Sequence, residues 1–203
     1  GVLDKTQLYS NLILSTTQPF IFGDRGITPS GPGNYFNGKI DDIGIWNRAL
    51  TEQEITSLYT QNYVAQIPSY VPTNGLVGYW PFNGNTNDES GNGNNGAVNG
   101  ATLTTDRFGF NNSAYSFDGV NDFINGSLSN FSNTSKSTLA VWLRCTGDAA
   151  GLPYDMFFQY GLIGTHTLTY SYNYSNAQFD LSSRCFTSPY SIPNEIRNGW
   201  HHF

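Results

Sequence analysis

The sequence predicts an all-β protein built from two packed sheets, and three observations support this class. Aromatic residues make up 15% of the 203 residues and favour strands, while the 22 glycines favour turns. Charged residues make up only 12% of the chain. Apolar and polar residues alternate over 114–117 and 167–174, as they do in strands with one buried face. Many strands beside one short helix are typical of a two-sheet sandwich.

The expected strands follow from short apolar runs that Gly, Pro or Asn separate. A loop rich in Asn and Gly, 83–96, interrupts them after the strand that begins at Leu76. In chain order the expected positions are 8–14, 19–22, 35–46, 76–80, 97–103, 113–118, 121–124, 137–145, 156–163, 167–174, 177–182 and 200–203.

One helix is expected, over residues 51–62. Thr51 is a suitable N-cap, and Glu54 three residues later completes a capping box. Leu50 and Ile55 stand at the two positions of a hydrophobic staple. These local signals together predict where the helix begins more firmly than where it ends.

The charge balance argues against two classes of partner. The chain has 9 basic and 15 acidic residues, a net charge of −6, and no cluster of Lys and Arg. Binding to nucleic acid or to an anionic membrane surface needs such a cluster. No apolar run approaches the roughly 18 residues of a membrane-spanning helix. We therefore expect neither nucleic-acid binding nor membrane insertion.

Catalysis is not expected from these residues. Retaining glycoside hydrolysis needs two carboxylates about 5 Å apart, and none of the four glutamates has a spacing that would place a pair on one strand. His201 and His202 are adjacent, so they point to opposite faces of the expected strand and cannot easily share a metal.

Two motifs are more specific than composition. The first is FNGKIDDIGIWNRALT, at 36–51, which leads into the helix. The second begins at 75–85, continues at 88–93 and ends at 114–119. The first resembles the closing strand and helix of laminin-G-like domains of the concanavalin A-like lectin/glucanase superfamily, and the second resembles their opening strands. The resemblance implies an all-β, two-sheet antiparallel jelly-roll sandwich of the concanavalin A-like type.

The closing motif precedes the opening motif, which predicts a junction between tandem repeats. Residues 1–66 resemble the C-terminal part of one laminin-G-like domain, 67–73 a linker, and 74–203 the N-terminal part of a second domain. Two arrangements follow: separate partial domains, or one permuted sandwich in which strand 36–47 lies beside strand 76–82. We favour the second. The resemblance implies a large secreted or cell-surface parent protein, often bacterial, with a role in adhesion or polysaccharide binding.

The resemblance also implies a structural calcium ion. In related domains the first and last strands lie side by side and often bind calcium there, which transfers to Asp42 and Asp88, with Asn83 as a neutral ligand. The alternative is that these residues are turn formers and a strand-end cap.

Two further pairs of residues are candidates, one for ligand contacts and one for a disulfide. Tyr154 and Tyr160 flank a Gly/Pro region and are candidates for exposed sugar contacts. Cys145 and Cys185 are the only cysteines, and they form either a disulfide or two buried thiols.

The combined prediction is a non-catalytic module with structural calcium, in an extracellular or cell-surface protein. Its partner would be a carbohydrate, a cell-surface glycoconjugate or another surface ligand. The alternatives are a structural spacer or adhesin repeat without its own ligand, and an accessory domain of a glycoside hydrolase whose catalytic domain lies elsewhere.

Overall fold

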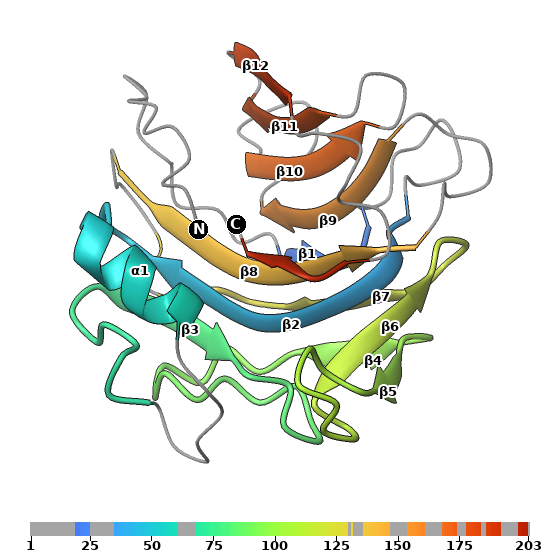
Figure 1. Ribbon diagram of the computed structural model, residues 1–203, viewed down its shortest axis with the longest axis horizontal. Coiled ribbons are helices and arrows are strands. Elements are labelled where there is room, and N and C mark those ends of the chain that lie inside the picture. The colour runs from blue at the N-terminus through green and yellow to red at the C-terminus, as the bar shows by residue number, and fades with distance from the viewer. Residues whose placement is uncertain are drawn as a thin grey trace.

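The computed structural model describes residues 19–24, 35–60, 68–129, 131, 136–146, 154–160, 168–173, 178–183, 186–191 and 199–202. Within these residues the protein is a sandwich of two antiparallel sheets with one short helix (Figure 1). The expected all-β sandwich is confirmed.

The first sheet has seven strands in the order β12-β11-β10-β9-β1-β7-β4. Their bounds are Phe20–Phe22 (β1), Ala97–Asn99 (β4), Phe123–Gly126 (β7), Tyr154–Tyr160 (β9), Leu168–Asn173 (β10), Gln178–Ser183 (β11) and Phe186–Ser191 (β12). The short strand β1 pairs antiparallel with both β7 and β9, so it lies inside the sheet.

The second sheet has six strands, in the order β13-β8-β2-β6-β5, with β3 also paired to β2. Their bounds are Asn37–Trp46 (β2), Leu76–Trp80 (β3), Thr102–Thr104 (β5), Ala114–Asp118 (β6), Thr138–Cys145 (β8) and His201–His202 (β13). The long strand β2 is its centre, because β8 flanks it on one side and β3 and β6 flank it on the other.

Two details differ from the expected elements, and one expected strand lies outside the described residues. The run 97–103 forms two short strands, β4 and β5, which belong to different sheets. Gly100 separates them with φ +79°, a conformation that glycine adopts without strain. Strand β12 was not expected, and the run 8–14 lies outside the described residues.

Strands from both sides of residues 67–73 build the same sheets. Gly44 of β2 lies opposite Tyr79 of β3, so the two strands pair as the permuted arrangement requires. Residues 68–73 pack on the sheet: Val71 is 3% exposed, and the indole Nε1 of Trp46 donates a hydrogen bond to the Pro72 carbonyl at 2.7 Å. The division into two laminin-G-like repeats stays a prediction.

The main core lies between the two sheets and is largely aromatic. Phe22 of β1 packs edge-on against Trp80 of β3, with ring centroids 5.2 Å apart. The largest fully buried side chains of this cluster are Trp80, Tyr160, Phe20, Phe22, Phe36, Phe82, Phe117, Phe131, Phe158 and Ile40.

The helix α1 (Glu52–Thr60) begins where its capping signals predict. The Thr51 amide donates to Glu54 Oε2 at 2.8 Å, and the Glu54 amide donates to Thr51 Oγ1 at 3.3 Å. This reciprocal pair is a capping box. The expected end at residue 62 lies outside the described residues.

A second, smaller apolar cluster lies on the opposite face of the six-stranded sheet. Leu58 of α1 and Val71 pack there against Trp46, Tyr79 and Ala140. Figure 1 shows α1 across one end of β2 and β8. The rest of this face carries the candidate site.

Candidate functional site

Two consecutive aspartates of β2 reach the same side of the sheet because the strand is bulged there. In the pairing with β8, Asp41 lies opposite Trp142 but Gly44 lies opposite Ala140, so β2 has one residue more than its partner. Asp42 has φ +46°, in the left-handed region that aspartate tolerates better than most residues. Neighbouring residues of a regular strand point to opposite faces, and a bulge changes that direction.

Arg107 connects the two carboxylates. Its Nη1 lies 2.5 Å from Asp41 Oδ2 and its Nη2 lies 2.7 Å from Asp42 Oδ2. The Arg107 and Asp41 side chains are 7% and 3% exposed, whereas Asp42 is 22% exposed. The guanidinium carbon also lies 4.3 Å from the ring centre of Phe108 and 4.6 Å from that of Trp142. Arg107 is therefore held by two ion pairs and two cation–π contacts.

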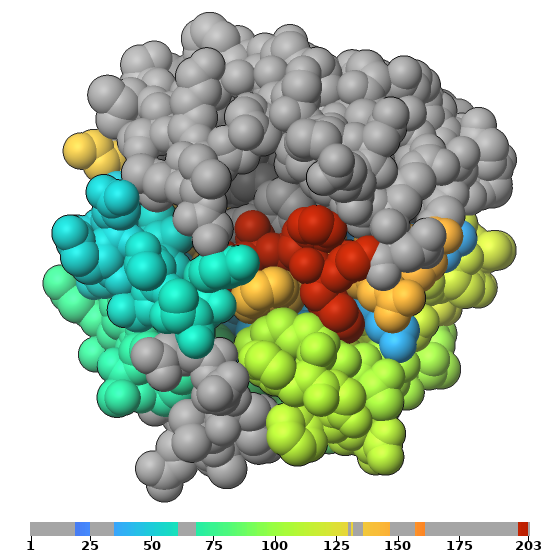
Figure 2. Space-filling model, viewed as in Figure 1, coloured from blue at the N-terminus to red at the C-terminus, as the bar shows by residue number. Residues whose placement is uncertain are grey.

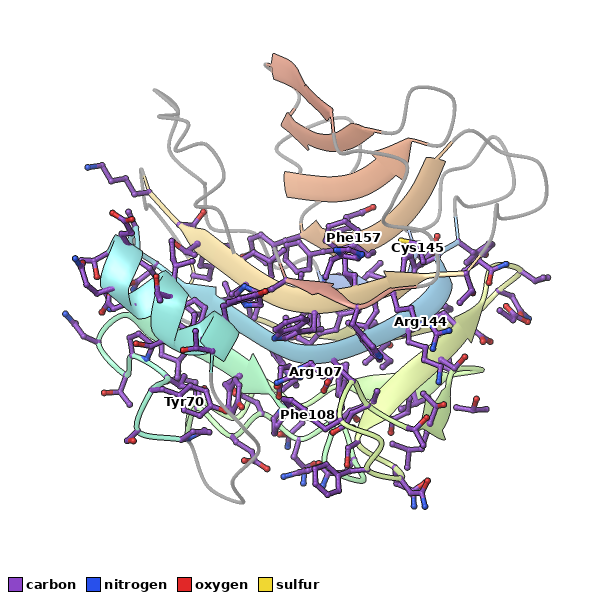
Figure 3. The ribbon with its side chains drawn as sticks, viewed as in Figure 1. Tyr70, Arg107, Phe108, Arg144, Cys145 and Phe157 are labelled. Carbon is purple, nitrogen blue, oxygen red and sulfur yellow. The ribbon has the colours of Figure 1, made fainter. Side chains whose placement is uncertain are left out.

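The loop between β5 and β6 places Arg107 over the sheet. The Asp106 carboxylate accepts hydrogen bonds from the amides of Phe108, at 2.8 Å, and Phe110, at 2.9 Å. The Ser113 amide donates to the Thr104 carbonyl at 3.0 Å and closes the loop. Figure 3 shows Arg107 and Phe108 next to each other below β2, whereas Phe157 and Cys145, which belong to the main core, lie above it.

Four aromatic rings lie in or beside this charge centre, and we call them the aromatic face. Phe108 and Trp142 contact Arg107, while Tyr59 of α1 and His202 of β13 pack against Trp142 of β8. The Tyr59 and Trp142 rings stack at 5.6 Å and 13°, and His202 packs 5.1 Å from Trp142. Tyr59 is 40% exposed and Phe108 is 43% exposed. In Figure 2, α1, segment 199–202 and the loop that follows β5 surround an opening in which β8 is visible.

A shallow, open hollow adjoins the aromatic face. Trp142 and His202 border it together with Asp42, Tyr70 and Tyr79. The Tyr79 hydroxyl donates to Asp42 Oδ1 at 3.4 Å. The hollow therefore combines apolar ring surfaces with one partly exposed carboxylate.

The site is short of positive charge. Burial raises the pKa of Asp41 well above its usual value, and the neighbouring Asp42 adds to this effect. Burial also raises the pKa of Asp42, and it raises that of Tyr70 to about 12. Burial and the Arg107 charge lower the pKa of His202 to about 4, so His202 is neutral at neutral pH.

A comparison of the sequence with models of protein families gives a match over part of the chain. A laminin-G-type model, described as the concanavalin A-like lectin/glucanases superfamily, matches residues 1–56, which include β1, β2 and the start of α1. The match covers 56 of the 203 residues and shows what this part of the chain is similar to. Searches of curated proteins and of solved structures found no match. The resemblance stated from the closing motif is therefore confirmed.

The superfamily resemblance suggested three calcium ligands, and the structure gives each of them other partners. Asp42 is paired with Arg107. Asp88 accepts three backbone hydrogen bonds, from Tyr79 and Ser90 at Oδ1 and from Asn94 at Oδ2, all within 3.0 Å. Asn83 donates its amide to Glu89 at 2.6 Å. Within the described residues, no three His, Cys, Asp or Glu side chains gather as a metal site.

The expectation that Tyr160 is an exposed sugar contact is wrong. Tyr160 is 2% exposed, and its hydroxyl donates to the Phe131 carbonyl at 3.2 Å. Its strand β9 lies inside the seven-stranded sheet, between β10 and β1, and Tyr160 is part of the main core. The side chain of Tyr154 lies outside the described residues.

The predicted cysteine pair is described only in part. Cys145 is buried in the main core, whereas Cys185 lies outside the described residues. The disulfide therefore stays a prediction. In the part of the chain that the structure describes, no helix is long and apolar enough to cross a membrane.

The sequence reasoning did not find Arg107 or the aromatic face. Arg107 and Asp41 are 66 residues apart in the chain, so no local motif joins them. The one available signal is the sequence Asp106-Arg107-Phe108, which places a rare cation beside an aromatic residue in a chain with few basic residues.

Proposed function

We propose that this chain is a non-catalytic recognition module for neutral carbohydrate, in a secreted or cell-surface protein. The observation that carries the proposal is the aromatic face beside Asp42. Aromatic rings with exposed surface can pack against the apolar C–H faces of a sugar ring. The neutral His202 offers one donor and one acceptor to sugar hydroxyls, and Asp42 offers the lone pairs that Arg107 and Tyr79 leave free. The extracellular location rests on the superfamily resemblance.

The charges favour a neutral rather than an anionic sugar. Among the described residues that border the site, Arg107 is the one with a permanent positive charge. Both of its terminal nitrogens are bonded to Asp41 and Asp42, and its side chain is 7% exposed. A sialylated or sulfated sugar would meet the Asp42 carboxylate without an accessible cation, which is unfavourable.

The carboxylate geometry supports a non-catalytic role. Glycoside hydrolases place two carboxyl groups on either side of the scissile bond, about 5–5.5 Å apart in retaining enzymes and 6.5–9.5 Å apart in inverting ones. Asp41 and Asp42 instead bind the two nitrogens of one guanidinium. Both carboxylates are therefore engaged by the same cation.

A glycan array that contains neutral, sialylated and sulfated sugars tests the proposal. We expect binding to neutral sugars, and a loss of at least roughly tenfold in affinity for Phe108→Ala and for Tyr59→Ala, since each removes a ring that the ligand would cover. The matched control is Phe110→Ala, because Phe110 is 53% exposed on the same loop but is outside the aromatic face.

Three results would contradict the proposal. A preference for sialylated or sulfated sugars would overturn the ligand class. Equal binding by Phe108→Ala, Tyr59→Ala and the Phe110→Ala control would place the site elsewhere. Failure to bind any glycan would favour the spacer interpretation.

A further inference from the structure

The resemblance implies a structural calcium ion, but the residues present do not fit one. Calcium needs several oxygen atoms whose lone pairs face the ion. Asp42 directs Oδ2 to Arg107 and accepts the Tyr79 hydroxyl at Oδ1. Asp88 uses both oxygens to accept backbone amides, which makes it a cap for the loop 83–96.

We infer that the Arg107 guanidinium supplies the positive charge that calcium would supply, so that this module is stable without metal. The first argument is charge. Asp41 is 3% exposed, and an ionised carboxylate so far from water is strongly disfavoured unless a cation is paired with it. Arg107 is that cation, and it serves Asp41 and Asp42 together.

The second argument is geometry. A guanidinium presents its N–H groups in a fixed planar fork, so two carboxylates can bind it only if they approach along two set directions. The bulge in β2 provides this, because the left-handed backbone of Asp42 brings its carboxylate to the same side as that of Asp41. Left-handed backbone is unfavourable for a residue other than glycine and persists only when the surroundings hold it.

The third argument is the position of the link. Arg107 lies on the loop between β5 and β6, whereas Asp41 and Asp42 lie on the central strand β2. The ion pairs therefore fasten this loop to the middle of the sheet, which is what a structural metal bridging the same elements would do. The rings of Phe108 and Trp142 cover the guanidinium and keep it from water.

Thermal unfolding of the whole chain, without any sugar, tests the inference. We expect melting temperatures in chelator and in millimolar calcium to agree. A native metal site at a hundredfold excess over its Kd would instead raise the melting temperature of a chain this size by about 5–10 °C. A rise of that size that Asp42→Asn abolishes would overturn the inference. Asparagine is chosen because it also tolerates the left-handed backbone.

The second experiment looks for a variant whose melting temperature depends on calcium although that of the wild-type chain does not. Arg107→Met keeps much of the side-chain volume but removes the charge, so we expect a lower melting temperature that calcium partly restores. The matched control is Arg48→Met, because Arg48 binds Glu54 in a two-nitrogen ion pair at the surface. If Arg107→Met were as insensitive to calcium as Arg48→Met, Arg107 would not hold the place of a metal.

If Arg107→Met does not fold, the wild-type chain still decides the question. Terbium binds calcium sites, and tryptophan nearby sensitises its emission, so a site beside Trp142 would give a bright signal. We expect no saturable terbium signal, and one that calcium displaces would overturn the inference. No arm uses a sugar, so failure of the proposed carbohydrate binding would leave these results unaffected.

Discussion

Substitutions at Asp42 test whether its backbone is strained. Asp42→Gly and Asp42→Ala both remove the ion pair with Arg107, at a cost of about 1.5–3 kcal/mol for a charged hydrogen bond that is 22% exposed. At φ +46° alanine carries a further penalty of about 1–2 kcal/mol that glycine avoids. Glycine loses about 0.5–1 kcal/mol more chain entropy than alanine on folding. The alanine variant should therefore be the less stable by about 0.5–1 kcal/mol.

Asp41 is the matched control. It binds the same guanidinium, but its φ is not among the positive values of the described residues. At Asp41 the alanine variant should be the more stable one, as is usual in a strand, with Asp41→Gly about 0.5–1 kcal/mol less stable than Asp41→Ala. Urea unfolding followed by tryptophan fluorescence gives the four free energies of unfolding. If glycine were also worse than alanine at Asp42, the bulge would not aim its carboxylate through a left-handed backbone.

Two further predictions concern the start of α1. Thr51→Ala removes the oxygen that the Glu54 amide binds at 3.3 Å and should lower the free energy of unfolding by about 1 kcal/mol, which urea unfolding can measure. Glu54 binds Arg48 and the Thr51 amide, which lower its pKa to about 2. Since the folded-state pKa is the lower one, the stabilisation is present above the unfolded pKa of about 4.3 and is lost as the pH falls towards 2. Glu54→Gln should therefore lower the melting temperature at neutral pH but have little effect near pH 2, and an equal difference at both pH values would contradict the role of the ion pair.

The sequence predicts those features that depend on neighbours in the chain. The helix start follows from Thr51 and Glu54, which are three residues apart and bind each other. The strands follow from alternation and turn formers, and the pairing of β2 with β3 follows from the two motifs in their unusual order. The split of 97–103 between two sheets was missed, because only the tertiary fold decides to which sheet each half belongs.

The site could be predicted only in part. The motif drew attention to Asp42, but a residue pattern does not show that a bulge turns this carboxylate towards Asp41. Arg107 lies on a distant loop and binds both Asp41 and Asp42. The calcium ligands suggested from the sequence therefore did not include the residue that pairs with Asp42. Tyr160 was misjudged for a similar reason: the Gly/Pro region nearby suggested exposure, but its strand lies inside the sheet next to β1 and its side chain is buried.

The central position of β2 has a consequence for how the protein folds. Gly38 pairs with Phe117 on one side and with Cys145 on the other, so the middle of the sheet joins segments far apart in the chain. Contacts of such long sequence separation slow folding, because a large loop must close before they form. During synthesis β1 and β2 emerge long before β9 and β8, so the edge of each strand that pairs with β9 or β8 stays unpaired until then. Chaperones or neighbouring copies of the same strands would meet these edges first, which exposes β1 and β2 to mispairing.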